Sequence, residues 1–399
     1  MSFALDTRIG FFLAVRQVRR ASKWTTGLII FVMVLTFLNL VVVSGILVGL
    51  IEGSVRAVKE KYISDIIISP LLEKEYVEDS MNILAAVRAL PEVDAAMPRV
   101  RKGVVFEANY KTRRDDEKPN TAGGQLVGID LASESSVTHL AENIVEGKFL
   151  EPGDYDQVVL GHYLLKKYLP IESPAFTTLE DVHPGSKIRI RIGETVREVT
   201  VKGILKTKVD EVSMSAFMLA PQVRALTGRD IDNVSEISVK LKTGADPERV
   251  RDTLLARGFG RSARVQTFEE GQPKFLKDMI QTFGLLGAGF SSIGLVVASI
   301  TIFIVIFINA LTRRKFIGIL KGIGVSGGAI ETAYVFQSIF YALAGSAIGL
   351  AIVYLLLVPY FAANPIDFPF SDGILVAPVS STMLRAGLLI IAALIAGYL

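Results

Sequence analysis

The sequence predicts an α-helical membrane protein with four transmembrane helices and a mixed α+β domain inserted between the first and second helices. Two observations lead to this prediction. Half of the 399 residues are hydrophobic and the mean hydropathy is +0.44, although 21% of the residues are charged. The charged residues are excluded from four long stretches, which are residues 25–51, 283–311, 332–366 and 386–399.

The first three stretches exceed the 20 or so apolar residues that a helix needs to cross a membrane. The third must contain a turn near Pro359, and the fourth crosses only if its helix begins near Ser380 and Arg385 extends to the head groups. Buried core helices are an alternative, but three charge-free stretches of this length are scarce in soluble folds. A cleaved signal peptide would have a shorter apolar segment and a small-residue cleavage site before Glu52. We expect spans at 25–51, 283–311, 332–358 and 380–399.

The orientation follows from the cations beside the spans, because basic loops stay in the cytoplasm. The prediction is a multi-pass protein of the inner (cytoplasmic) membrane with its N-terminus in the cytoplasm. Residues 1–24, a basic amphipathic helix, and the loop 312–331 are then cytoplasmic, whereas 52–278 and the short loop 361–379 lie outside. Because the excess of positive charge belongs to these flanking segments, it gives no support to nucleic-acid binding. The flanking cations are Arg8, Arg16, Arg19, Arg20, Lys23, Arg313, Arg314, Lys315 and Lys321.

The segment 52–278 reads as a mixed α+β domain of one or two lobes, split near 110–185. Alternating residues predict a hairpin of strands 187–192 and 196–205 with Gly193 at the turn. Asp246 and Pro247 predict the start of a helix that ends at Gly258. The other predicted strands are 65–69, 93–108, 125–130, 237–241 and 263–267, the other helices are 81–90 and 221–227, and 157–169 is a strand that runs into a helix through Gly161.

No catalytic, cofactor-binding or metal site is expected on this chain. It has no cysteine, so thiolate chemistry and disulfides are excluded. Its three histidines, His139, His162 and His183, lie in separate segments. The charged segment 111–120 mixes acidic and basic side chains, which is typical of a solvated, mobile hairpin end; its acidic members are Asp115, Asp116 and Glu117.

The segment 312–324 predicts a short amphipathic helix. Phe316, Ile319, Leu320 and Ile323 follow at i, i+3, i+4 and i+7, which gives one apolar stripe beside the cations. Gly327 and Gly328 are expected to end the helix. Glycines that leave its surface bare, so that another backbone can approach, are Gly318, Gly322 and Gly324.

Periodicity leaves two roles open for this helix: it lies on lipid, or it docks in a protein groove. Residues 322–327 also fit the pattern G-x-G-x-x-G, but no strand precedes them and no acidic residue follows at the required distance, so a dinucleotide site is not expected. No P-loop pattern occurs in the chain.

Small residues predict close helix contacts within the spans. Gly284, Gly287 and Ser291 lie in the second span, and Gly345 and Gly349 form a G-x-x-x-G pair in the third. Ordinary tolerance of glycine in membrane helices explains these residues equally well.

The run RRKFIGILKGIGVSGG resembles the cytoplasmic segment of MacB/LolC/FtsX-type ABC transporter permeases. The layout of one span, a large outer domain and three further spans is similar too. DIIISP, VDAAMPRV, QLVGID and EGKFLEPGDYDQVVLG resemble parts of the MacB-like periplasmic domain, and FFLAVRQVRR resembles the basic helix that precedes the first span. The family continues beyond the fourth span into a basic tail, whereas this chain stops at Leu399, so we expect a fragment or a chain without that tail.

The resemblance implies a permease that forms a homodimer or pairs with a paralogous permease. ATP would bind to a separate or fused ATPase, with no cofactor on this chain. Residues 313–324 would be the coupling helix, and its contacts with the ATPase would come from Phe316, Ile317, Ile319 and Leu320. Closing of the ATPase would rearrange the outer domain by mechanotransmission, with export or release of a lipoprotein, peptide or lipophilic compound.

Two alternatives remain at this stage. An FtsX-like regulator would activate a cell-wall hydrolase outside the membrane, and a membrane-anchored binding protein would need no ATPase. The last leaves the apolar stripe of 316–323 unexplained. Further partners implied are membrane lipids and a membrane-fusion or other extracytoplasmic protein.

Overall fold

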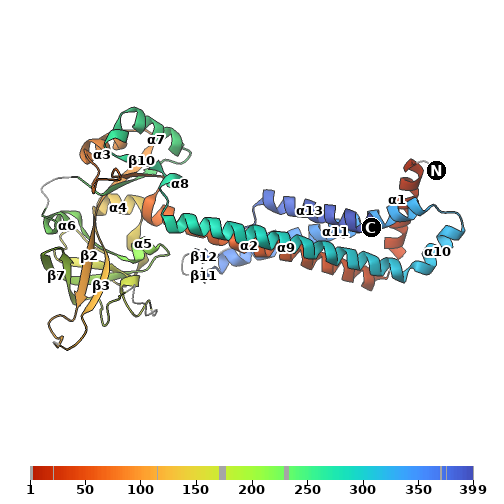
Figure 1. Ribbon diagram of the computed structural model, residues 1–399, viewed down its shortest axis with the longest axis horizontal. Helices are drawn as coiled ribbons and strands as arrows, with labels where there is room; N and C mark the ends of the chain where they lie inside the picture. The colour runs from red at the N-terminus through yellow and green to blue at the C-terminus, as the bar shows by residue number, and fades with distance from the viewer. Residues whose placement is uncertain are drawn as a thin grey trace. The chain divides into compact units, whose positions relative to one another are not determined.

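The computed structural model describes residues 3–20, 22–114, 116–169, 177–228, 233–368, 371–373 and 375–398. Two compact units are present (Figure 1). We call the first the helical unit, which comprises Met1–Gly53, Asp278–Phe368 and Asp372–Leu399. We call the second the sheet domain, which comprises Ser54–Lys277 and Pro369–Ser371.

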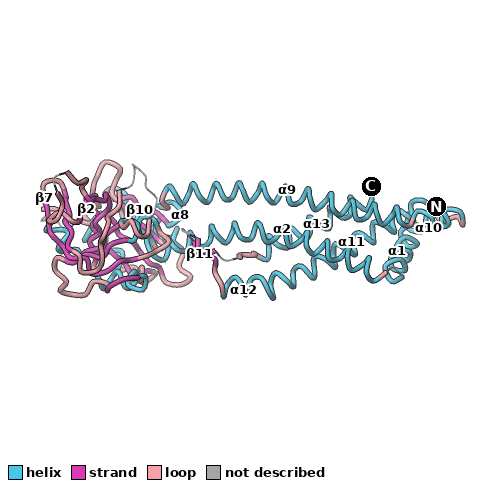
Figure 2. Tube along the Cα trace, turned by 90° about the horizontal axis from the view of Figure 1, so that it is seen from below, coloured by secondary structure: helices cyan, strands magenta, loops and turns pink. Residues whose placement is uncertain are grey.

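Figure 2 shows most strands gathered in the sheet domain and long helices in the other unit. The long helices and their connections are α1 (Phe3–Arg20), α2 (Lys23–Val58), the π-helix η1 (Lys59–Ile63), α9 (Lys274–Thr312), α10 (Arg314–Gly322), α11 (Gly327–Ile352), the π-helix η5 (Val353–Leu357), α12 (Val358–Ala363), β11 (Ile366–Phe368), β12 (Ser371–Gly373) and α13 (Val379–Tyr398).

Four helical segments among the described residues are long and apolar enough to cross a membrane, and each overlaps one of the four predicted spans. They are Lys23–Ile63, Lys274–Thr312, Gly327–Ala363 and Val379–Tyr398. The second has 39 residues, which is about 58 Å of helix against about 30 Å of hydrocarbon. The first two spans therefore extend well beyond their charge-free stretches.

The predicted turn near Pro359 is wrong. The helix continues through Pro359 to Ala363, and the chain turns only after it. Proline lacks an amide hydrogen and its ring crowds the preceding turn. The π-helical turn η5 directly before Pro359 widens the helix at this point, which is how the proline is accommodated without a break.

The helical unit packs through one face of each long helix. Ile29, Met33, Phe37 and Val41 are buried at four-residue spacing on α2, so they form one stripe. Ala298, Ile302 and Ile306 form the matching stripe on α9, and α13 contributes mainly alanines. The rest of α9 is largely exposed, as expected of a surface that meets lipid or another protein.

Gly345 and Gly349 let α11 approach α2. A Cβ built at Gly345 would lie 2.4 Å from the Met33 Cβ, and one at Gly349 would lie 2.4 Å from the Phe37 ring. A Cβ built at Gly284 would have no heavy atom within 4 Å. One built at Gly287 would have only the Leu47 Cδ1 atom, at 3.8 Å. Gly284 and Gly287 therefore make no close helix contact with the described residues, and Ser291 is half-buried. Gly10 of α1 was not predicted to make such a contact. A Cβ built at Gly10 would lie 2.8 Å from the Thr332 Cβ.

Gly349→Ala is expected to destabilise the helical unit by about 1–3 kcal/mol, because an overpacked core must shift to admit the methyl group. Thermal unfolding of the purified full chain in detergent measures the effect. Gly284→Ala is the matched control, since the added methyl group meets open space. Equal melting temperatures for the two variants would contradict the packing described here.

The sheet domain is built on one sheet, in the order β10-β1-β9-β2-β3-β8-β5-β7-β4, with β6 paired to β2 and β7. Its strands are β1 (Ile66–Ser69), β2 (Val93–Ala108), β3 (Asn120–Ile129), β4 (Ile144–Gly147), β5 (Gln157–Gly161), β6 (Lys187–Ile192), β7 (Thr195–Leu205), β8 (Ser215–Leu219), β9 (Glu236–Leu241) and β10 (Arg264–Thr267). Its helices are α3 (Ser80–Arg88), α4 (Leu131–Val137), η2 (Leu140–Asn143), η3 (His162–Leu164), α5 (Asp210–Ser213), α6 (Ala220–Leu226), α7 (Pro247–Ala256), η4 (Phe259–Arg261) and α8 (Phe268–Gly271).

Strand β2 joins the two ends of this sheet. Its first half pairs with β9, and its second half pairs with β3 and β6. Strand β1 lies between β9 and β10, and both of its pairings are antiparallel. Helices α3 and α7 lie at the end of the domain that contains β10 (Figure 1).

Most elements predicted for this domain are confirmed. The hairpin of β6 and β7 forms, and the Asp246 carboxylate caps α7 by accepting a hydrogen bond from the Glu248 amide. The helix predicted after Gly161 is wrong, because only the three-residue turn η3 follows β5. The charged segment 111–120 is the turn between β2 and β3; Asp115 lies outside the described residues.

Candidate functional sites

Helix α10 exposes three large apolar side chains along one face. Phe316, Ile319 and Ile323 are 67%, 62% and 72% exposed. They follow at i, i+3 and i+7, so a single partner surface can contact all three. Gly318 and Gly322 face open space on the same short helix, which leaves part of its backbone uncovered as predicted. We call Phe316, Ile319 and Ile323 the exposed stripe.

The structure divides the predicted stripe between two faces. Ile317 and Leu320 are partly buried against the core of the helical unit, whereas the sequence analysis grouped Leu320 with the exposed residues. Arg313, at the N-terminal end of α10, is partly buried as well. The other cations, Arg314, Lys315 and Lys321, are exposed. Leu320 therefore anchors α10 to its own chain.

Gly324, and not Gly327–Gly328, ends α10. Gly324 has φ +92°, its amide donates to the Lys321 carbonyl, and the Val325 amide donates to the Leu320 carbonyl. This pair of bonds is the Schellman arrangement, which favours glycine at the left-handed position. Gly327 and Gly328 begin α11, because the Ser326 hydroxyl caps that helix by accepting from the Ala329 amide. The end of α10 is thus fixed by its own hydrogen bonds.

Helix α1 supports this region through α11. The Phe11 and Phe336 rings meet edge to face with centroids 5.4 Å apart. The Ser326 hydroxyl donates a hydrogen bond to the Asp6 carboxylate, so the start of α11 is tied to α1. The predicted amphipathic helix at the N-terminus is therefore an integral part of the helical unit.

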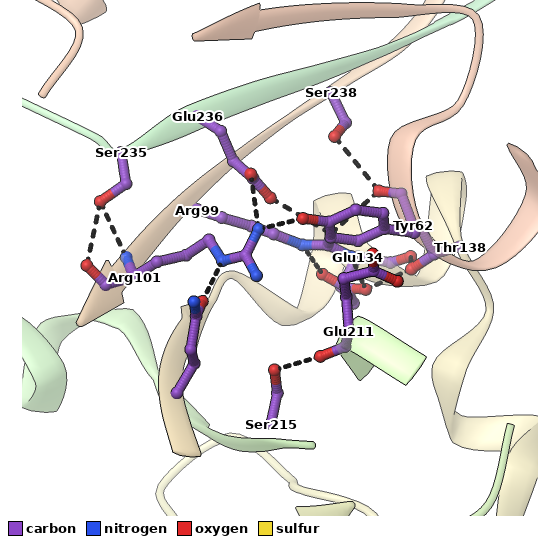
Figure 3. Close-up of polar contacts among 11 residues, drawn as sticks. Tyr62, Arg99, Arg101, Glu134, Thr138, Glu211, Ser215, Ser235, Glu236 and Ser238 are labelled. Carbon is purple, nitrogen blue, oxygen red and sulfur yellow. Dashed lines mark hydrogen bonds and ion pairs between the residues drawn. The ribbon is translucent and has the colours of Figure 1, made fainter. Parts of the chain in front are cut away.

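A second candidate site is a buried ionic cluster in the sheet domain (Figure 3), which we call the Arg99 network. The Arg99 and Glu134 side chains are each 2% exposed, with an Nη2 to Oε1 distance of 2.8 Å. Glu236 accepts from Arg99 at 3.4 Å and from Arg101 at 3.0 Å. Thr138 donates to Glu134. The charges are thus paired inside the domain, where an unpaired ion would be very costly.

Tyr62 connects this network to the end of the first long helix. Tyr62 belongs to η1, which directly continues α2. Its carbonyl oxygen accepts a hydrogen bond from Arg99 Nη1 at 3.0 Å, and its hydroxyl oxygen accepts a hydrogen bond from Arg101. The Ser238 hydroxyl of β9 also donates to the Tyr62 carbonyl. The last turn of this helix is therefore bonded to both β2 and β9.

The ionisation states of the cluster follow from this pairing. Burial opposes ionisation of Glu236, but Arg101 and Arg99 outweigh burial and hold the pKa of its carboxyl below the usual value. Burial raises the pKa of the Tyr62 phenol, and Glu236 raises it further. Glu236, Arg99 and Arg101 thus stay charged at neutral pH, and the Tyr62 phenol stays neutral.

Sequence analysis missed the Arg99 network. Arg99 and Arg101 alternate with apolar residues in β2, a pattern that is typical of a solvent-facing strand side. Glu134 and Glu236 are distant in sequence, so nothing in the chain order pairs them with Arg99. The one available signal is the pair of arginines two residues apart beside the apolar residues of β2.

The histidines form no site in the described part of the chain. Burial lowers the pKa of His162 to about 4, with Lys206 adding to the effect. His139 is partly exposed beside Glu142. Among the described residues, no group of three or more His, Asp or Glu side chains could hold a metal ion.

Comparisons with known proteins match both parts of the chain. Residues 30–257 match the MacB-like periplasmic core domain, and residues 288–399 match the FtsX-like permease C-terminal domain. A protein of Methanocaldococcus jannaschii described as an uncharacterized ABC transporter permease is 26% identical over 217 residues. That alignment covers 54% of this chain and 51% of the relative, so the chain spans about half the length of this protein.

Two solved structures are similar to this chain at low identity. The periplasmic region of MacB from Actinobacillus actinomycetemcomitans has 13% identity and a TM-score of 0.37, and the match covers 56% of this chain and 95% of that one. The extracellular domain of the noncanonic ABC-type transporter YknZ from Gram-positive bacteria has 15% identity and a TM-score of 0.33, with 51% and 98% covered.

Proposed function

The chain belongs to the MacB/FtsX family of ABC transporter permeases, and on that premise we propose that it couples ATP hydrolysis on a separate subunit to work outside the membrane. The client is a lipoprotein, a peptide or a lipophilic compound. ATP binds to the partner subunit, and the permease itself carries no catalytic residue. The working unit contains two permeases, either identical or paralogous.

The exposed stripe of α10 is the observation that carries this proposal. Phe316, Ile319 and Ile323 are large apolar side chains that remain mostly exposed although Ile317 and Leu320 anchor α10 to the helical unit. A rigid helix with one uncovered apolar face suits a groove in another protein. The cations beside it favour a cytoplasmic position for 312–331 under the positive-inside rule, and ATP is available there. The same rule places 52–278 outside.

The Arg99 network supports a route by which movement reaches the sheet domain. Hydrogen bonds join Tyr62, at the end of the first long helix, to strands β2 and β9. Displacement of that helix end must therefore move the centre of the sheet or break buried ionic bonds. In our proposal the ATPase moves α10, the long helices carry the movement, and the sheet domain changes its grip on the client.

Photo-crosslinking from α10 tests the proposed partner. The chain has no cysteine, so Ile319→Cys introduces its sole thiol, to which a benzophenone maleimide can be attached. We expect illumination of intact cells to trap a P-loop ATPase subunit. Val379→Cys is the matched control, because Val379 is exposed to the same 62%. It begins the segment Val379–Tyr398, at the end that the proposed topology puts outside the membrane.

Capture of phospholipid alone from Ile319→Cys would reject the coupling role and leave an anchored binding protein. The FtsX-like alternative predicts the same ATPase crosslink but a different client. Co-purification of a cell-wall hydrolase with the full chain, lost when 52–278 is replaced by another domain, would assign the regulator role.

A further inference from the structure

A basic pocket lies between α1, α10 and α11, and Phe316 of the exposed stripe is among the residues that line it. Its volume is about 300 Å³. Arg16 and Arg20 line it from α1, and Arg313 lines it from the start of α10. Leu13, Ile317 and Leu320 form apolar parts of its wall. Three cations thus share one small cavity with an apolar surface.

The three guanidinium groups have no carboxylate partner. Among the described residues, none of Arg16, Arg20 and Arg313 forms an ion pair with an acidic side chain, and the Arg16 guanidinium carbon lies 5.9 Å from the centroid of the Phe12 ring. Asp6, the acidic residue of α1, is bonded to Ser326. Three neighbouring cations repel one another, so the pocket gains energy when an anion enters it.

Two buried polar atoms in the same pocket also lack a partner in the described structure. Tyr334 is 7% exposed, and its hydroxyl has no hydrogen-bond partner. The Gln17 Oε1 atom is equally unpaired. Both residues line the pocket. A buried hydroxyl without a partner costs about 1–3 kcal/mol. The Tyr334 hydroxyl is closed off in this structure, so it becomes a donor to a bound ligand once a small shift of the neighbouring side chains opens it to the pocket.

We propose that this pocket binds the phosphate of an anionic phospholipid. Guanidinium groups suit phosphate because they donate paired hydrogen bonds to its oxygens. An acidic side chain of a protein partner would neutralise the charge but leave Leu13, Ile317 and Leu320 uncovered. A phospholipid satisfies both, because its glycerol and the first carbons of an acyl chain contact the apolar wall.

The position of the pocket fits a lipid source. Helix α1 exposes Leu5, Phe11, Phe12 and Val15, which are apolar side chains typical of a helix at the membrane surface. Basic pockets on the cytoplasmic side of membrane helices bind anionic head groups. The bound lipid would join α1 to α10 and set the position of α10 before the ATPase docks. The proposal uses the topology proposed above but not the identity of the ATPase or the client.

Lipid titration of the purified full chain, without any ATPase, tests the site. Native mass spectrometry would follow binding of phosphatidylglycerol and of phosphatidylcholine to the detergent-solubilised protein. We expect one tightly held phosphatidylglycerol per chain and weaker binding of phosphatidylcholine. Each arginine should contribute about fivefold to the affinity, so the triple variant Arg16→Gln, Arg20→Gln, Arg313→Gln should lose well over tenfold.

A matched variant removes three cations from the same two helices outside the pocket. Arg8→Gln, Arg314→Gln, Lys315→Gln should bind phosphatidylglycerol with nearly unchanged affinity. Tyr334→Phe, which keeps the packing of the ring, should weaken binding severalfold while raising the melting temperature of the lipid-free protein, because the unpaired hydroxyl is removed. Equal losses in the two triple variants would overturn the proposal.

Three further outcomes would also overturn it. Equal affinity for the two phospholipids would show that no anionic group is recognised. Displacement of phosphatidylglycerol by millimolar inorganic phosphate would indicate a free-anion site. Expulsion of the lipid on addition of the ATPase would assign the pocket to an acidic side chain of that protein. Because the titration uses the permease alone, its result is independent of the α10 crosslink.

Discussion

Ile319→Asp is expected to abolish stimulation of the partner ATPase and to reduce its co-purification with the permease by more than tenfold. Burying an isoleucine contributes about 1.5–3 kcal/mol, and the substitution also leaves a carboxylate in an apolar groove. Since about 1.4 kcal/mol corresponds to a tenfold change in affinity, the combined loss exceeds one order of magnitude. Ile319 is 62% exposed, so the permease itself should fold normally.

Val379→Asp is the control for this variant, because it adds the same charge at a site of equal exposure in α13. Pull-down from membranes and ATP hydrolysis by the reconstituted complex are the two measurements. If Ile319→Asp binds the ATPase and stimulates ATP hydrolysis as the wild type does, α10 is not a coupling helix. Leu320→Asp is a poor substitute, since Leu320 packs against its own chain and its loss would damage the fold.

Arg99→Met is expected to destabilise the sheet domain by about 3–5 kcal/mol, the usual cost of leaving a buried ion without its partner. The substitution leaves the Glu134 carboxylate, 2% exposed, with no cation beside it. Hydrogen exchange in the full chain, read from peptides of β2 and β9, measures this loss locally. Transport should fail although α10 still binds the ATPase, because the bond from Arg99 to the Tyr62 carbonyl is gone.

Arg197→Met is the matched control. Arg197 makes the same type of bidentate bond to Asp156 at 2.7 Å, but both side chains are about half exposed. Exposed pairs contribute at most about 1 kcal/mol, so exchange should change little. A double variant, Arg99→Met with Glu134→Gln, should recover part of the loss because the unpaired charge is removed. Identical exchange in Arg99→Met and Arg197→Met would refute the energetic role of the Arg99 network.

The elements predicted from the sequence are those whose hydrophobic and charged residues form a pattern over neighbouring positions. The spans follow from charge-free stretches, and the hairpin of β6 and β7 follows from strict alternation. Strand β8 was missed because Ser215–Leu219 is an almost wholly buried strand, so it shows no alternation. Helix α4, with the sequence LASESSV, was missed because it is short and rich in serine.

The candidate sites were only partly predictable, for a different reason. Helical spacing places Ile319 and Leu320 near one another on α10, but it cannot reveal which of them meets the rest of the chain. That depends on the positions of α1 and α11, which are set by contacts between residues far apart in sequence. The Arg99 network has the same character, since Arg99 joins Glu134 and Glu236 across long separations.

The pairing of β1 with β10 bears on how the segment between the first two long helices can be exchanged for another. Residues 66–69 directly follow the first long helix, residues 264–267 shortly precede the second, and the two strands are paired to each other. The ends of the intervening segment are therefore neighbours, which is the arrangement in which whole modules are exchanged most readily. Everything between these strands can therefore be exchanged for another module while the sequences of the flanking helices remain unchanged.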